Sequence, residues 1–301
     1  YITDIVIPNG VKAIKSYTFS YCDRLTSVTL PNSVESIGYG AFSYCRKLET
    51  ITMPYNLREI GSAAFYDCQA LQSIEIPAKV GTIGSSAFYY CMKLETITMP
   101  SNLSVIGSSA FSACTALKEI TIPEGVKTIE DDTFHSCSSL ARITLPSTLT
   151  TIGSWAFSGC SSLTRVDISD IANWCKINFG YDPRNNPLSV ANAALYLNGS
   201  EIISIDADMG IKSFSDYCFT GCSSIKYLDA NRNEIGSYAF EGCPNLEKVS
   251  SLSKIGYAAF RNCTKLQTIS SLSNASIGHI SSFILIFLNF TLFPFIEHSP
   301  I

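Results

Sequence analysis

The stretch AFSYCRKLETITMP, residues 41–54, recurs along the chain at a fixed interval of 23 residues. In each copy a Cys follows the Phe after three residues, and a Leu follows the Cys after three more. The Phe positions are Phe19, Phe42, Phe65, Phe88, Phe111, Phe134 and Phe157, and the Cys positions are Cys22, Cys45, Cys68, Cys91, Cys114, Cys137 and Cys160. A period in the low twenties with apolar positions at fixed offsets is typical of a solenoid. We therefore predict a repeat solenoid with buried Phe, Cys and Leu columns.

Each repeat contains one alternating segment that ends at a proline. In residues 48–53, Leu48, Ile51 and Met53 alternate with polar neighbours, which predicts a half-buried strand. Pro54 follows, and its missing amide and fixed φ end the strand. The next segment of a repeat, such as residues 106–114, places apolar residues at helix-like offsets. We expect short parallel strands on a concave face and helical or 3₁₀ turns on a convex face.

The repeats extend over most of the chain, and we expect one solenoid over residues 1–282 with about ten to eleven repeats. The 23-residue period holds over residues 1–166, an insertion containing aromatic residues occupies about 169–200, and shortened repeats fill 201–282. Val166 and Ile205 are expected to hold the same strand position; they lie 39 residues apart, 16 more than one period of 23. Residues 283–301 are expected to form an irregular apolar C-terminal tail.

The charge balance argues against two classes of partner. Charged residues make up 15% of the chain and the net charge is −4, so there is no basic surface for nucleic acid or for an anionic membrane. The run FILIFLNFTLFPF, residues 283–295, is shorter than the roughly 20 residues that span a bilayer. We therefore expect no nucleic acid partner and no membrane insertion. The chain begins inside a repeat, which suggests a piece of a longer protein.

Cysteine and histidine positions favour neither a metal site nor catalysis. The 12 Cys include no C-x-x-C pair, and stacked column cysteines would lie about 5 Å apart with parallel Cα–Cβ directions, so we expect buried free thiols. Glu130, Asp131 and Asp132 form an acidic cluster that suits either Ca²⁺ or, more simply, a solvated turn. The sequence contains no nucleophile elbow or phosphate-binding loop. We predict a protein that is not an enzyme and that has no cofactor and no metal.

The consensus LxxIxIPxxVxxIGxxAFxxC resembles the BspA-like, or Treponema pallidum-type, leucine-rich repeat of bacterial surface proteins over residues 1–282. That resemblance implies an extracellular or cell-surface protein, with its leader and anchor outside this sequence, that adheres to host matrix proteins or other cells. We expect a monomeric binding module for an extracellular protein or glycan. The alternative is a passive spacer that displays another domain of a larger surface protein.

Strand residues that point away from the core are the first candidates for ligand binding. They form a flat polar strip that can accept a protein or glycan, although Thr is also simply a favourable residue on an exposed strand. In either case we expect these side chains to face solvent. The candidates are Thr29, Thr52, Glu75, Thr98, Thr121, Thr144 and Asp167 in one column, and Thr50, Thr96, Glu119 and Arg142 in the adjacent column.

The insertion supplies the second set of candidates, because departures from a repeat often mark binding loops. Trp174 and Tyr181 would be the aromatic anchors of such a loop. The alternative is a longer coil whose aromatic residues only fill the core. A group of tyrosines near the Cys column is a further possible aromatic rim, open to the same alternative of partial burial: Tyr21, Tyr44, Tyr66, Tyr89 and Tyr90.

Overall fold

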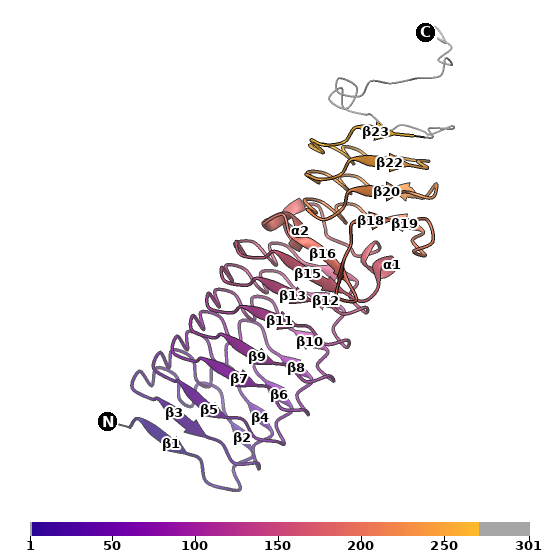
Figure 1. Ribbon diagram of the computed structural model, residues 1–301. Coiled ribbons are helices and arrows are strands. Elements are labelled where there is room, and N and C mark those ends of the chain that lie inside the picture. Colours follow the sequence, from indigo (N-terminus) through magenta and orange to yellow (C-terminus); the bar gives the residue numbers. More distant parts are fainter. Residues whose placement is uncertain (1, 271–301) are drawn as a thin grey trace, which may run out of the picture.

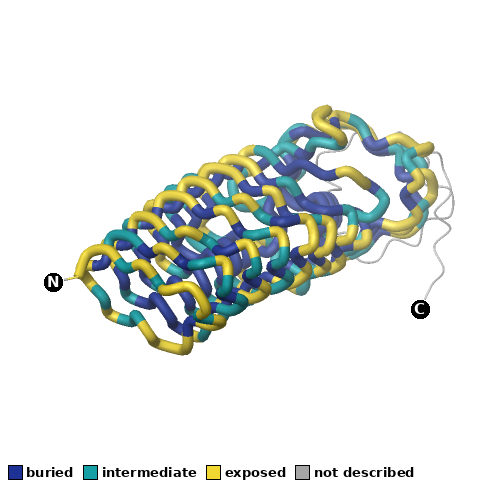
Figure 2. Tube along the Cα trace, turned by 90° about the horizontal axis from the view of Figure 1, so that it is seen from below, coloured by how far each residue is buried: buried dark blue, intermediate teal, exposed yellow. Residues whose placement is uncertain are grey.

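The structure, a computed structural model, describes residues 2–270 as an elongated stack of coils (Figure 1). The predicted tail at residues 283–301 and the end of the last predicted repeats lie outside the described residues. Figure 2 shows buried residues along the interior of the stack and exposed residues on the outside of each coil. The core is therefore one continuous column that neighbouring coils share, as a solenoid requires.

Each of the first seven coils contributes two short strands, one to each of two parallel stacks. The first stack contains β1 (Asp4–Val6), β3 (Ser27–Thr29), β5 (Thr50–Thr52), β7 (Ser73–Glu75), β9 (Thr96–Thr98), β11 (Glu119–Thr121) and β13 (Arg142–Thr144). The second contains β2 (Ala13–Ile14), β4 (Ser36–Ile37), β6 (Glu59–Ile60), β8 (Thr82–Ile83), β10 (Val105–Ile106), β12 (Thr128–Ile129) and β14 (Thr151–Ile152). We call their outward surfaces the first-strand face and the second-strand face.

The first stack confirms the strand predicted from the alternating segment. Ile5, Val28 and Ile51 are Cα partners in successive parallel strands, so the strands pair with the 23-residue register of the sequence repeat. The second stack was not predicted. Its strands have two residues each in these coils, which is too short for an alternating pattern to be visible.

The predicted helical or 3₁₀ segment is a series of turns. Cys45 N–H donates to Phe42 O at 3.2 Å and Leu48 N–H donates to Cys45 O at 3.0 Å, which is the i→i−3 bonding of a 3₁₀ turn. Tyr44, between Phe42 and Cys45 in the chain, has a φ of 62°, in the left-handed region. A residue in that conformation cannot continue a right-handed helix, so these segments form single turns and no regular helix.

Stacked aromatic rings and buried thiols fill the core. From Phe19 to Phe157, consecutive column rings stack with centroids 5.3–5.7 Å apart. All 12 cysteines are free, and the column thiols donate to backbone carbonyls, as in Cys68 Sγ to Phe42 O at 3.2 Å. Burial raises the pKa of Cys45 and of Cys160 to about 12. The prediction of buried free thiols is confirmed except at Cys22 and Cys263, which are half-buried. The thiols of Cys45 and Cys160 are protonated at neutral pH.

The insertion begins after β15 (Arg165–Ile168) and contains short helices and a hairpin. In chain order these elements are α1 (Ile171–Trp174), the 3₁₀ helix η1 (Pro183–Asn185), α2 (Pro187–Val190), β16 (Ala194–Leu197) and β17 (Ser200–Glu201). Strand β16 is parallel to β15, with Leu195 as the partner of Val166, and β17 returns antiparallel to β16. The prediction that Ile205 follows Val166 in the strand stack is therefore wrong, because Leu195 already occupies that position.

The remaining strands resume the parallel stacking. They are β18 (Ser204–Ile205), β19 (Ser213–Phe214), β20 (Tyr227–Asp229), β21 (Glu234–Ile235), β22 (Lys248–Ser250) and β23 (Thr268–Ile269). Ile205 pairs with Leu228, and Leu228 pairs with Val249, in the same relation as in the N-terminal coils. The coils are shorter from β20 onward, since Leu228, Val249 and Ile269 are partners 21 and 20 residues apart. The Phe stack also continues, with Phe219 and Phe240 centroids 5.0 Å apart.

Candidate binding surface

The first-strand face carries most of the predicted polar strip. Thr29, Thr52, Glu75, Thr98, Thr121, Thr50, Thr96, Glu119 and Arg142 are exposed. They face solvent because alternate strand residues point to opposite sides of a sheet, and the intervening residue, such as Ile120, is buried. Thr144 is half-buried. The strip is therefore a surface of threonine side chains interspersed with a few charged ones, on parallel strands held in register.

Asp167 departs from this pattern, and the expectation that it faces solvent is wrong. Its side chain is only 8% exposed, because two arginines cover it. Arg142 Nε donates to its Oδ2 at 2.8 Å, and Arg165 donates through Nε at 2.8 Å and through Nη2 to Oδ1 at 2.7 Å. Burial by itself raises the pKa of Asp167, but the hydrogen bonds from Arg165 and Arg142 outweigh it and hold the pKa below its ordinary value of 3.8. The carboxylate is ionised at neutral pH and fixes both guanidinium groups.

A groove lies between the ends of β11, β13 and β15 and the turn of the β16–β17 hairpin. It has a volume of about 440 Å³. The turn of the hairpin, Asn198–Gly199, forms part of its lining, together with the ends of the three strands. We call it the hairpin groove; its lining is Thr121, Ile122, Pro123, Glu124, Arg142, Thr144, Leu145, Asp167, Ile168, Ser169, Asn198 and Gly199.

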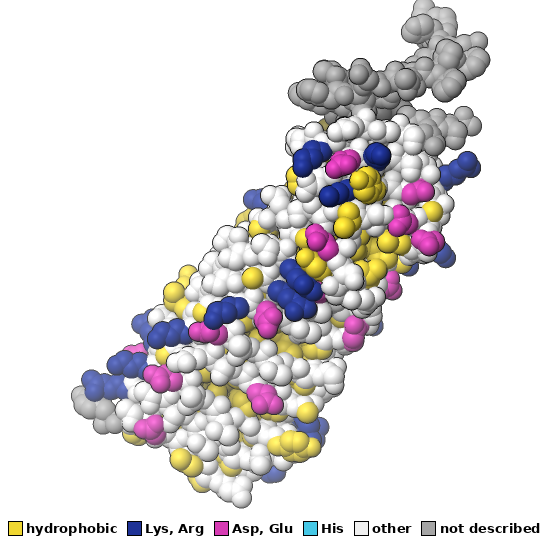
Figure 3. Space-filling model, viewed as in Figure 1, with side chains coloured by type: hydrophobic (Ala, Val, Ile, Leu, Met, Phe, Trp, Pro, Cys, Tyr) yellow, Lys and Arg dark blue, Asp and Glu magenta, His cyan; other side chains and the backbone are white. Residues whose placement is uncertain are grey.

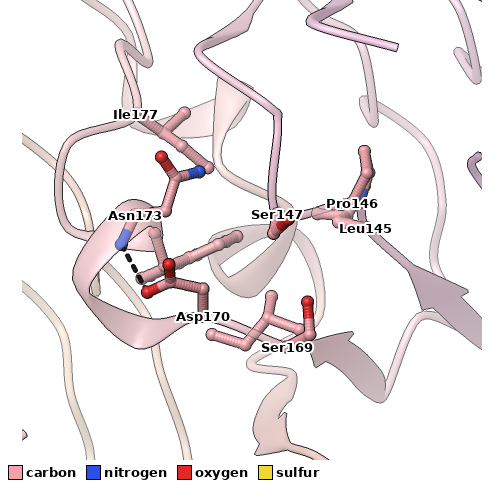
Figure 4. A pocket seen from close by; sticks show the side chains of 9 residues that line it. Leu145, Pro146, Ser147, Ser169, Asp170, Asn173 and Ile177 are labelled. Atoms are coloured by element: carbon pink, nitrogen blue, oxygen red, sulfur yellow. Dashed lines mark hydrogen bonds between the residues drawn. The ribbon is translucent and has the colours of Figure 1, made fainter. Parts of the chain in front are cut away.

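Beside the groove is a much smaller cavity that shares Leu145, Ile168 and Ser169 with it (Figure 4). Its volume is about 10 Å³, enough for about one water molecule. Asp170 Oδ1 accepts a hydrogen bond from Asn173 N at 2.9 Å and so caps the start of α1. This cavity is too small for a ligand, whereas the groove beside it has room for one.

Trp174 does not act as an exposed anchor, so this part of the insertion prediction is wrong. It is 1% exposed, its Nε1–H donates to Cys218 O at 2.8 Å, and its ring packs edge-on against Phe179 with centroids 5.4 Å apart. The stated alternative, in which the insertion aromatics fill the core, holds for Trp174 and Phe179. Tyr181 is 97% exposed and is free to meet a ligand.

Trp155 is an exposed aromatic residue that the sequence analysis missed. It is 50% exposed, and its backbone N–H donates to Asn185 Oδ1 in the insertion at 2.9 Å. Its φ of 55° lies in the left-handed region. A signal was present in the sequence, since five of the six preceding positions in the 23-residue register hold small or short residues, Tyr17 being the exception: Gly40, Ala63, Ser86, Ser109 and Asp132.

The tyrosine rim is a stack of rings rather than a set of separate anchors. Tyr21 and Tyr44 stack with centroids 4.5 Å apart, and Tyr66 and Tyr89 stack at 4.9 Å. Tyr21 is exposed, whereas Tyr44, Tyr66 and Tyr89 are half-buried. Because stacked rings cover each other's faces, this rim offers ring edges and hydroxyl groups to solvent.

Charges of both signs are interspersed on the face seen in Figure 3, and no broad region of it carries one sign alone. In the acidic cluster, Asp131 Oδ1 accepts a hydrogen bond from Ser154 N in the next coil at 2.6 Å. Within residues 2–270, no three His, Cys, Asp or Glu side chains are grouped so that they could hold a metal ion. In the same part of the chain, none of the helices has both the length and the apolar character needed to cross a membrane.

Solved structures of leucine-rich repeat proteins from T. pallidum and Bacteroides ovatus agree with the fold. A leucine-rich repeat protein of T. pallidum is 34% identical, with a TM-score of 0.51, over 54% of this chain and 78% of that one. A leucine-rich repeat protein from Bacteroides ovatus is 29% identical, with a TM-score of 0.60, over 92% and 75%. A leucine rich cell surface protein from Faecalibacterium prausnitzii is 23% identical, with a TM-score of 0.31, over 94% and 90%. No curated protein matches the chain in sequence.

The family comparison covers most of the repeats. The BspA type leucine rich repeat region matches in 6 copies, over residues 1–118, 106–179 and 190–295. These ranges include the Phe and Cys columns, the paired strands and the hairpin that lines the groove. The chain belongs to the family of BspA-type leucine-rich repeat proteins.

Proposed function

We propose that this chain is a non-enzymatic, adhesin-like binding module of a cell-surface or secreted protein, and that it recognises an extracellular protein or glycan through the first-strand face. The observation that supports it most is the division of each strand into a constant and a variable part. Buried positions repeat as Ile, Val or Leu, whereas the exposed positions beside them change among Thr, Ser, Glu, Arg, Asp and Val.

The physical character of this face suits recognition by many small contacts. Thr is β-branched and stiff at χ1, so a row of threonines loses little side-chain freedom when a partner docks. The parallel strands hold their hydroxyl groups at the strand spacing of about 4.8 Å. The hairpin groove interrupts this even surface and gives it one concave site of ligand size.

The test of this function is binding to a panel of matrix proteins and glycans by the chain with Thr98→Arg and Thr121→Arg together. Both residues are exposed on the first-strand face, so the long charged side chains should weaken binding by about tenfold or more without unfolding the protein. Surface plasmon resonance would measure the affinity, and circular dichroism would check the fold.

Val105→Arg is the matched control, because Val105 is 47% exposed on strand β10 of the second-strand face. It should leave the affinity unchanged. Equal binding by the wild type and the double variant would remove the first-strand face as the binding surface. An absence of saturable binding to every member of the panel would favour the passive spacer.

A further inference from the structure

The hairpin groove contains one arginine whose charged end is open to a ligand. Arg142 donates to Asp167 through Nε and is 45% exposed, and it lines the groove. Arg165 uses both Nε and Nη2 on the same carboxylate, and its guanidinium carbon lies 3.9 Å from the centroid of the Tyr196 ring. Asp167 and Tyr196 thus hold Arg165 in place. Within residues 2–270 no hydrogen bond occupies the Nη groups of Arg142, and they belong to a side chain that lines the groove.

The charges around Arg142 disfavour a ligand with two negative charges. Two arginines and Asp167 leave a net charge of +1, and Glu124 in the groove lining brings the total for these four groups to zero, so the attraction for an anion comes from the Nη groups of Arg142. Glu124 Oε2 accepts hydrogen bonds from the backbone N–H of Ser147 at 3.0 Å and from the Ser147 hydroxyl group at 2.8 Å. This second carboxylate would repel a dianion such as phosphate more strongly than a monoanion. A carboxylate also matches the planar end of a guanidinium group.

The rest of the lining favours a sugar over a peptide. The hydroxyl groups of Thr121, Thr144 and Ser169 and the amide of Asn198 can each donate and accept, as sugar hydroxyl groups require. A peptide that binds by strand addition needs a free strand edge. Strand β13 is paired with β11 and β15, and β15 is paired with β13 and β16, so neither offers a free edge. Strand β11 ends this sheet, and its other side packs beside β9.

From these observations we propose that the hairpin groove binds a sugar carboxylate, such as a uronic acid residue of a glycan, and that Arg142 pairs with the carboxylate group. This rests on the proposed function, since it names the ligand class for one part of the first-strand face. Asp167 and Arg165 act as positioning residues, because they fix the Nε side of Arg142 and leave its Nη groups for the ligand.

Titration of the purified chain with methyl β-D-glucuronide and with methyl β-D-glucoside tests the proposal, because the two sugars differ in the carboxylate. Saturation-transfer NMR and calorimetry would measure binding. We expect the glucuronide to bind about tenfold or more tightly than the glucoside, and added salt to reduce that preference. Arg142→Gln should abolish the preference while Arg165 continues to hold Asp167.

Arg46→Gln is the matched control. Arg46 also donates through Nε to a buried aspartate, Asp67, at 2.8 Å with 53% of its side chain exposed, but it lies outside the groove lining. It should keep the preference for the glucuronide. The proposal is overturned if the two sugars bind equally to the wild type, if Arg142→Gln keeps the preference, or if N-acetyl-aspartyl amide binds more tightly than the glucuronide.

A separate variant distinguishes this proposal from the proposed function. Thr98 is exposed on the first-strand face and does not line the groove. Thr98→Arg should weaken binding of the larger partner and leave glucuronide binding unchanged. Loss of both in Thr98→Arg would contradict a separate sugar site in the groove, whereas loss of neither would contradict only the use of the wider face.

Discussion

Replacing Phe111 with Ala is expected to lower the free energy of unfolding by about 3–5 kcal/mol, as for other large-to-small substitutions in a close-packed core. Phe111 is fully buried and stacks with Phe88 at 5.5 Å and with Phe134 at 5.7 Å. The substitution leaves a cavity between two neighbouring coils and removes both ring contacts. Urea denaturation followed by circular dichroism would measure the loss.

The same substitution at the N-terminal end of the column is the control. Phe19 is only partly buried, and its ring stacks on Phe42 in the next coil. Phe19→Ala should therefore cost roughly half as much as Phe111→Ala, because fewer neighbours lose contacts. Equal losses at the two positions would mean that stacking between coils contributes less to stability than the structure implies.

Trp174→Ala is expected to have an effect of similar size, about 3–5 kcal/mol, since it removes a large buried side chain. It also leaves Cys218 O, which accepts from Trp174 Nε1 at 2.8 Å, without that donor. The chain has 2 tryptophans, so each single variant isolates the fluorescence of the other. Trp155→Ala should leave a blue-shifted emission that acrylamide quenches poorly, and should change stability by no more than about 0.5 kcal/mol.

The opposite pattern would contradict the placement of Trp174. If Trp174→Ala left stability unchanged, or if the remaining tryptophan in Trp155→Ala were readily quenched by acrylamide, Trp174 would be an exposed residue. It would then return to the set of ligand-binding candidates. Thermal unfolding of both variants in the same buffer gives an independent check of the stability difference.

The repeat columns could be predicted from the sequence because each position depends on its spacing alone. Phe42, Cys45 and Leu48 recur in every one of the first coils, and a stack of identical coils must bury identical positions. Thr29 and Thr98 could be placed on the surface by the same alternation. These predictions needed no knowledge of which distant residues meet.

Asp167 and Trp174 could not be placed in this way, since their burial depends on partners outside the repeat pattern. Asp167 follows Thr144 in a column that is exposed from Thr29 to Thr121, yet two arginine side chains cover it. Trp174 reaches the carbonyl of Cys218 across the irregular part of the stack. In contrast, the hairpin that lines the groove had a usable signal, because Asn198–Gly199 between alternating segments is typical of a tight β-hairpin turn.

The central claim is that the Phe, Cys and Leu columns form the scaffold and that the first-strand face binds the extracellular partner. New thiols can test it, because the column thiols are buried and only Cys22 and Cys263 are half-buried. The starting protein has Cys22 and Cys263 changed to Ala, and each variant adds one new thiol: Thr52→Cys, Thr98→Cys or Val105→Cys. The rate of maleimide labelling would be measured with and without a partner identified from the panel of matrix proteins and glycans. We predict that the partner slows labelling at the first two positions and leaves Val105→Cys unaffected. Slowing at Val105→Cys alone would contradict the account.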